Sequence, residues 1–255
     1  MLTPKQMQDR IEFAKAVLLL PDSFFDHLVF SDESWMIVAD MSKFAWQKIG
    51  VDEVDIYECA HPTKRMVWAG ISAQAPYITK LHFCEFEEFY KQLPKGYHTK
   101  AKGLGALYYS EAILKQEWAD WVKRHPHAIL RDDGASAHKK SFMPAFWAET
   151  EGIGKSMRFH YKIDWPANSP DLNPIENFWA VMKVMKNRAC VNSAQGMEAA
   201  LKQWRDRLRG LRAVRDASVC QGVDGRDGCP SSARRFQQWW RMGALGCFQF
   251  LNSVE

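Results

Sequence analysis

The sequence contains no long hydrophobic run and no closely spaced pair of cysteines. No apolar stretch approaches the roughly 20 residues that cross a bilayer, and Met1 to Lys5 does not resemble the start of a secretory signal. The six cysteines form no Cys-x-x-Cys pair, so we expect free thiols and no zinc site. These absences predict an intracellular protein without a membrane partner.

The sequence also lacks a strong charge of one sign over most of its length. The net charge is +4, but residues 201–255 hold ten basic and five acidic side chains, which leaves 24 basic and 25 acidic residues in 1–200. Contacts with a nucleic-acid backbone would therefore need local patches, for which the candidates are His138, Lys139, Lys140, Lys183 and Lys186. A solvated helix face explains the same lysines equally well.

The hydrophobic content of 47% over 255 residues supports a substantial core. Hydrophobic periodicity and turn residues predict alternating strands and helices, and hence an α/β fold with a mixed sheet between helices. Helices are expected at 3–18, 111–123, 139–149 and from Pro174, and strands at 27–31, 35–39, 44–48, 65–72, 76–84, 127–132 and 158–163.

The most informative segment is DWPANSPDLNPIENFWAVMK, residues 164–183. Its prolines mark a turn, and apolar residues at helical spacing follow, so Glu176 should lie in the first turn of a helix that starts at Pro174. Asn173-x-x-Glu176 also fits a capping box, in which the carboxylate has no chemical role.

Two further segments place acids at the ends of apolar runs. HLVFSDESWMIV (residues 27–38) carries Asp32, and HAILRDDGASAH (residues 127–138) carries Asp132 and Asp133. Ligands in open α/β sheets bind at the carboxyl ends of strands, and clustered carboxylates suit divalent cations. Each acid can also be explained as a turn former.

Taken together, FSDES, MVWAGIS, DGASAH and WPANSPDLNPIENFW occur in the order found in Tc/mariner superfamily transposases, and the chain resembles their DDE catalytic domain. Residues 2–18 resemble the helix that links the family's DNA-binding region to that domain. The resemblance covers roughly residues 1–190 and implies an RNase H-like fold with a five-stranded mixed sheet. Ser136, where many relatives carry proline, and a longer gap between Asp133 and Glu176 are departures from the pattern.

The resemblance implies roles for individual residues. Asp32, Asp133 and Glu176 would be catalytic and would bind two Mg²⁺ or Mn²⁺ ions, while Asp132 would be a neighbour rather than a ligand. The implied reaction is hydrolysis of DNA phosphodiesters followed by strand transfer, without a small-molecule cofactor. His138 would contact phosphate, support a ligand from behind or cap a helix. The partners would be transposon-end and target DNA, and a homodimer is compatible with this role.

The resemblance also suggests a division of the chain. We expect a linker helix at 1–22, a catalytic domain at 23–190 and a helical or irregular, poorly ordered basic tail at 191–255. About twenty residues precede the first predicted strand, too few for the family's helix-turn-helix module, so base-specific contacts are not expected.

Three other functions remain open from the sequence. The protein would be an inactive relic or domesticated DNA-binding module if it had lost its chemistry, or an RNase H-like nuclease if it cut without transposition. A glycosidase with paired acids would act without a divalent metal.

Overall fold

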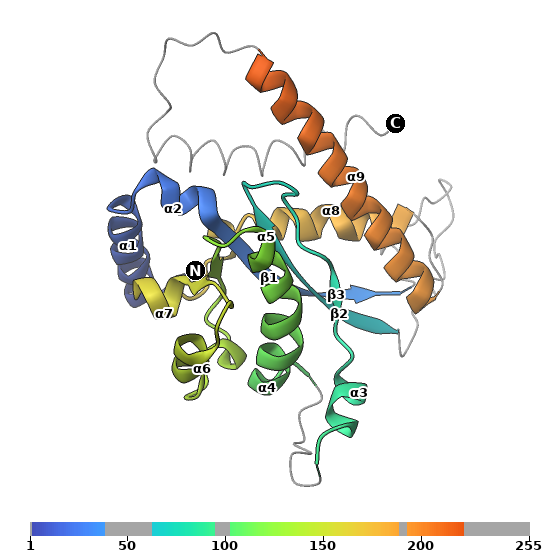
Figure 1. Cartoon of the computed structure of the whole chain (residues 1–255), viewed down its shortest axis with the longest axis horizontal. Helices are drawn as coiled ribbons and strands as arrows, with labels where there is room; N and C mark the ends of the chain where they lie inside the picture. The colour runs from blue at the N-terminus through green and yellow to red at the C-terminus, as the bar shows by residue number, and fades with distance from the viewer. Residues whose placement is uncertain (1, 39–62, 95–102, 189–192, 222–255) are drawn as a thin grey trace, which may run out of the picture.

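The fold is built on a mixed five-stranded sheet (Figure 1). The computed structural model describes residues 2–38, 63–94, 103–188 and 193–221. The strand order is β3-β2-β1-β4-β5, with β1 antiparallel to β2 and parallel to β4. The strands are β1 (Leu28–Ile37), β2 (Lys64–Ser72), β3 (His82–Phe83), β4 (Ile129–Arg131) and β5 (Lys155–Ser156). The predicted fold class is thereby confirmed, and the strand predicted at 44–48 lies outside the described residues.

β1 is one continuous strand, whereas the sequence predicted two strands separated at Asp32. Asp32 pairs with Ala69 in the middle of the ladder with β2, because Glu33 and Ser34 continue the same backbone pairing. The neighbouring strand β4 pairs with β1 only as far as Phe30. Asp32 therefore lies just beyond the end of β4, on a part of β1 that β4 does not cover.

The residues of β1 alternate between two cores, one on each face of the sheet. Leu28, Phe30 and Met36 pack in one cluster with residues of α8 (Ile175–Arg188). Val29 packs on the other face with Trp118 and other residues of the continuous helical stretch α4 (Ala106–Tyr108), η1 (Tyr109–Trp118) and α5 (Ala119–Arg124). This stretch contains the predicted helix 111–123, and it lies in front of the sheet in Figure 1, with α8 behind. Asp32, an even-numbered residue of β1, belongs to the α8 face.

The N-terminal helix α1 (Pro4–Leu18), expected at 3–18, begins with a capping box between Thr3 and Gln6. Its apolar side Met7, Ile11, Ala14 and Leu18 is exposed. The helix packs through Phe13 and Val17 instead, against the core that contains α8. The short helix α2 (Asp22–His27) then leads into β1.

The strand predicted at 158–163 is a helix, α7 (Met157–Tyr161). The hydroxyl of Ser156 accepts a hydrogen bond from the Phe159 N–H and caps this helix, which ends at Lys162 in a left-handed conformation. β5 is therefore limited to Lys155 and the capping residue Ser156. The remaining short elements are α3 (Phe86–Lys91), η2 (Ser136–His138), α6 (Met143–Glu149) and η3 (Pro170–Leu172).

The folded unit continues past the boundary predicted at residue 190. The long helix α9 (Ala194–Gln221) buries Met197 and Leu201 completely in the same core as α8. Arg209 donates hydrogen bonds to the carbonyl of Ile78, so the first part of α9 is held to the sheet. None of the described helices is long and apolar enough to span a membrane.

Candidate active site

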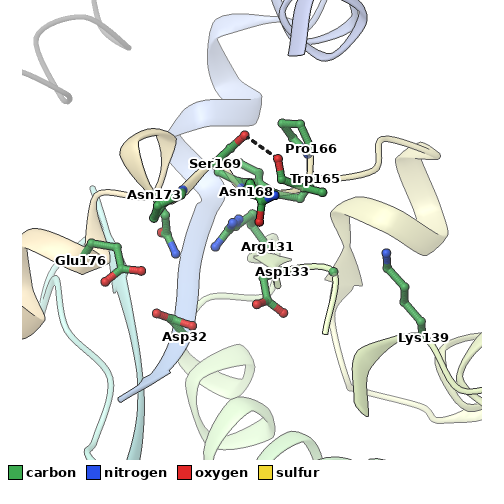
Figure 2. A pocket seen from close by; sticks show the side chains of 13 residues that line it. Asp32, Arg131, Asp133, Lys139, Trp165, Pro166, Asn168, Ser169, Asn173 and Glu176 are labelled. Carbon is green, nitrogen blue, oxygen red and sulfur yellow. Dashed lines mark hydrogen bonds between the residues drawn. The ribbon is translucent and has the colours of Figure 1, made fainter. Parts of the chain in front are cut away.

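The three acids singled out in the sequence line one cavity of about 350 Å³. Asp32 comes from the middle of β1, Asp133 follows β4, and Glu176 stands in the first turn of α8. Figure 2 shows the carboxylates of Asp32 and Asp133 turned toward the same space, with Glu176 pointing in from the other side of Asp32. The fold thus brings together side chains from three segments that are far apart in the sequence.

The local geometry does not support a capping box at the start of α8. The N–H of Asn173 donates to the carbonyl of Pro170, not to the side chain of Glu176. The N–H of Glu176 donates to the backbone carbonyl of Asn173, while the side-chain oxygen of Asn173 has no hydrogen-bond partner. α8 begins at Ile175, one residue after the predicted start. Glu176 is therefore not held as a cap, and its carboxylate faces the cavity.

Burial and neighbouring acids together perturb Asp32. Burial, together with the negative charges of Glu33, Glu176 and Asp133, raises the pKa of Asp32 from 3.8 to about 7. Like charges disfavour the ionised form of a neighbouring carboxyl group. Burial and the neighbouring acids therefore both disfavour the ionised form of Asp32 in the absence of a cation.

Asp133 has the opposite environment. Its Oδ1 accepts hydrogen bonds from the N–H of Ala135 at 2.7 Å and from Nδ1 of His138 at 2.8 Å. Burial alone would raise the pKa of Asp133, but His138 and the Ala135 N–H outweigh it and lower the pKa to about 2. Asp133 is consequently ionised and fixed in direction before any ligand binds.

His138 lies behind Asp133 and not on the surface. Its side chain is 2% exposed, its ring packs 4.2 Å from the ring of Tyr109, and its Nε2 lies 3.5 Å from Oε1 of Glu33. Burial opposes its charge, yet Glu33, Asp133 and Asp132 raise the pKa of His138 well above its usual value. A direct contact with a DNA backbone, one of the predicted roles, is excluded by this burial, whereas support of Asp133 from behind is what the contacts show.

Part of the chain that carries this geometry is similar to a known family of enzymes. Residues 100–195, which include Asp133 and Glu176, match the family model of the DDE superfamily endonucleases. The matched segment is about 38% of the chain, and over it the chain is similar to the DDE superfamily endonucleases. Asp32 lies outside the matched segment and is assigned to the site by the structure alone. No curated protein is significantly similar in sequence to the chain.

The solved structures that resemble this chain include complexes of Mos1 transposase. The Mos1 strand transfer complex has a TM-score of 0.58 at 14% identity and covers 97% of this chain and 63% of the Mos1 chain. The Mos1 mariner paired end complex with Mn has a TM-score of 0.58 at 15% identity, with 81% and 56% covered. The paired-end complex with left transposon end has a TM-score of 0.57 at 15% identity and the same coverage. These matches confirm the predicted RNase H-like fold, and the match of residues 100–195 to the DDE superfamily endonucleases agrees with the resemblance seen in the sequence.

Asp132 is separate from the three carboxylates that line the cavity. It is buried, lies 3.6 Å from Nε of Arg158, and is not among the residues that line the cavity. Burial raises the pKa of Asp132. The predicted distinction between Asp132 as a neighbour and Asp133 as a site residue agrees with this placement.

The predicted lysines divide into two groups. Lys139 lines the cavity and is exposed, and Lys140 and Lys183 are also exposed. Lys186 is 2% exposed, and its ammonium donates a hydrogen bond to the carbonyl of Ile37. Lys186 was therefore wrongly predicted as a backbone contact, because it lies on the side of α8 that faces the core.

Sequence reasoning gave no role to Glu33, Arg131 or Arg158, which form the surroundings of the acids. Arg131 lines the cavity, and Nη2 of Arg158 donates to the carbonyl of Asp133 at 2.9 Å. Strand alternation could have placed Glu33 on the face of β1 opposite Asp32. That His138 lies beside Glu33 is visible only in the folded structure. The basic residues gave no local sequence signal, because their partners are distant in the chain.

The loop before α8 is fixed by the N-terminal helix. Arg10 of α1 forms two parallel hydrogen bonds with the carboxylate of Asp171, at 2.8 and 2.6 Å, and a third with the hydroxyl of Ser169 at 3.0 Å. The ring of Phe13 also packs edge-on against Trp165, with centroids 5.0 Å apart. α1 therefore holds the loop that leads to Glu176.

The chemistry of the cavity fits hard divalent cations, since carboxylate oxygens are their preferred protein ligands. Within the described ranges, no three His, Cys, Asp or Glu side chains are gathered closely enough to form a ready-made metal site. The fit rests on the donor types of Asp32, Asp133 and Glu176 and on the electrostatic cost of Asp32, which a cation in the cavity would relieve.

Proposed function

We propose that this domain cuts and joins DNA phosphodiester bonds with two divalent cations, Mg²⁺ or Mn²⁺, held by Asp32, Asp133 and Glu176. The observation that carries the proposal is the convergence of these three carboxylates on one cavity in a DDE endonuclease fold. When bound, such cations activate the attacking water or hydroxyl and stabilise the leaving oxygen. The chain spans 56% to 63% of the length of the Mos1 chains it matches, so the activity of a whole transposase is part of the proposal.

The residues around the cavity have different tasks in this proposal. Asp133 is kept ionised and oriented by His138, which itself is buried and held by Glu33. Asp32 has a pKa of about 7 in the absence of cations and becomes a full ligand when a cation stabilises its ionised form. Glu176, which is not committed to capping, completes the set from α8. No side-chain nucleophile is needed, because water or a DNA hydroxyl attacks phosphorus.

DNA is the proposed partner. The relatives in structural comparison are Mos1 complexes, one of them with the left transposon end and others with Mn or Mg. Lys139, Lys140 and Lys183 are exposed and provide positive charge for backbone phosphates. Binding should weaken steeply with salt, because phosphate contacts release counterions.

The test compares purified wild-type protein with Glu176→Gln on end-labelled duplex DNA with Mg²⁺, with Mn²⁺ and with EDTA. We expect metal-dependent cutting and joining by the wild type and a loss of about 10²-fold or more in Glu176→Gln. Glu87→Gln is the matched control. It makes the same replacement on α3, at a side chain that is 93% exposed. Cutting without joining would favour a nuclease over a transposase, and equal cutting by wild type and Glu176→Gln would refute the assignment.

A further inference from the structure

Arg131 is a buried cation without a carboxylate partner. It is 1% exposed, yet no carboxylate of the described residues lies within ion-pair distance of its guanidinium. Its Nη1 donates to the carbonyl of Ser31 at 3.3 Å, and its Nε has no hydrogen-bond partner. Burying a charge that is not paired is costly. We therefore expect an anionic ligand to bind the guanidinium of Arg131 from the side that is not covered by protein.

That place is the cavity of the three acids, whose wall Arg131 forms together with Trp165 and Asn173. Figure 2 shows the guanidinium pointing into the space between Asn173 and Asp133. Burial lowers the pKa of Arg131, to about 10, but nearby acids, including Asp132 and Asp133, oppose the shift, so the group is a cation at neutral pH.

The guanidinium is fixed from behind. Its central carbon lies 3.4 Å from the centroid of the Trp165 ring, a cation–π contact. The backbone carbonyl of Arg131 accepts a hydrogen bond from the hydroxyl of Ser31 at 3.0 Å. A planar cation that is already held in place loses little freedom when it binds an anion, and its fork of N–H donors matches phosphate oxygens.

Asn173 adds a second polar group to the same wall. It is 4% exposed, and its side-chain oxygen is buried without a partner. This oxygen can accept a hydrogen bond that the folded chain does not supply, on the side of the cavity next to Glu176, and it does not compete with Arg131 for a phosphate oxygen.

We propose that Arg131 is a catalytic residue that binds a non-bridging oxygen of the phosphodiester undergoing cleavage, opposite the three acids. The proposal rests on the proposed function and names the group that receives the substrate's negative charge. In the cleavage step a water oxygen bonds to phosphorus as the bond from phosphorus to the 3′ oxygen breaks. The water releases one proton and the 3′ oxygen takes one up, while Arg131 stays protonated and stabilises the charge on the non-bridging oxygens.

The first experiment measures cutting at one linkage of an end-labelled duplex that carries either a phosphodiester or an uncharged methylphosphonate there. We expect Arg131→Met to cut the phosphodiester about 10²-fold more slowly than the wild type, with DNA affinity nearly unchanged. The methylphosphonate should slow cutting by the wild type strongly and cutting by Arg131→Met only a little. The variant has already lost the guanidinium that binds the charged non-bridging oxygen. Arg131→Lys, which keeps the charge but not the fork, should show an intermediate loss.

Arg124→Met is the matched control, since Arg124 also lies over a tryptophan, Trp121, but is exposed on α5 away from the cavity. The methylphosphonate could instead slow the wild type and Arg131→Met by the same factor. Arg131 would then only offset the charge of the acids and would not bind the phosphate. That result would overturn the proposal.

A second experiment needs no turnover and separates this proposal from the proposed function. Dimethyl phosphate is titrated into the protein with Mg²⁺, and the arginine Nε–H signals are followed by ¹⁵N NMR, with Arg131→Lys used for assignment. A saturable shift of the Arg131 signal, with that of Arg10 unchanged, supports the phosphate site even if the chain cuts no DNA. An unperturbed Arg131 signal refutes it, even if DNA is cut.

Discussion

The raised pKa of Asp32 makes a quantitative prediction for the stability of the metal-free domain. The pKa of Asp32 is about 7 in the folded domain, compared with 3.8 for an unperturbed aspartate. One pKa unit corresponds to about 1.4 kcal/mol, so ionising Asp32 costs the folded state roughly 4 kcal/mol. Between these two pKa values the folded state binds more protons than the unfolded state. The contribution of Asp32 to stability therefore falls as pH rises from about 4 to about 7 and then stays constant.

Asp32→Asn removes this cost while keeping the shape of the side chain. In EDTA at pH 8, we expect the variant to melt roughly 10 °C above the wild type, since 1 kcal/mol shifts the melting temperature by about 2–4 °C in a domain of this size. At pH 4 the two proteins should melt together. Differential scanning fluorimetry or circular dichroism across this pH range measures the difference.

The control is Asp9→Asn, which makes the same replacement at an exposed position of α1. It should leave the pH dependence of melting unchanged. If Asp32→Asn melts at or below the wild-type temperature at pH 8 in EDTA, burial and the neighbouring acids do not destabilise ionised Asp32, and the electrostatic argument for a cation in the cavity is lost.

Three further outcomes are expected. Mg²⁺ or Mn²⁺ should raise the melting temperature of the wild type through binding to the folded state, and Asp133→Asn should show a clearly smaller rise; equal rises would remove Asp133 from the ligand set. His138→Gln should raise the Mg²⁺ concentration that gives half of the stabilisation about 10- to 100-fold, because a residue behind a metal ligand orients that ligand. An unchanged midpoint concentration would contradict this role of His138. Gly154→Ala should destabilise the fold in urea unfolding by about 1–3 kcal/mol, more than Gly152→Ala: both glycines have positive φ, but a Cβ at Gly154 would lie 2.8 Å from Val122, whereas Gly152 faces open space.

The acids and the sheet class were predictable because their signals are local. An apolar run followed by Asp32, a second run followed by Asp133, and a proline-bounded helix start at Glu176 each lie within about a dozen residues. Local patterns failed where a single side chain decided between two structures. The segment after Ser156 reads as a strand, but the Ser156 hydroxyl caps a helix there.

The surroundings of the acids could not be predicted from local patterns. Glu33 and His138 meet only because β1 and the turn after β4 are neighbours in the sheet. Lys186 looks like a surface lysine in the sequence and is buried because it shares the inward side of α8 with Met182. Arg131 reads as an ordinary residue at a strand end, and its unpaired charge is visible only in three dimensions.

The attachment of α1 has a practical consequence for where the catalytic unit can be cut. Division by sequence would start that unit at residue 23 and discard α1 as a linker. Such a fragment would lose Arg10, leaving the carboxylate of Asp171 without this partner, and Phe13, which covers one edge of Trp165. Trp165 in turn supports Arg131. An excised domain that begins at residue 23 would thus retain all three acids and still lack part of the wall that surrounds them.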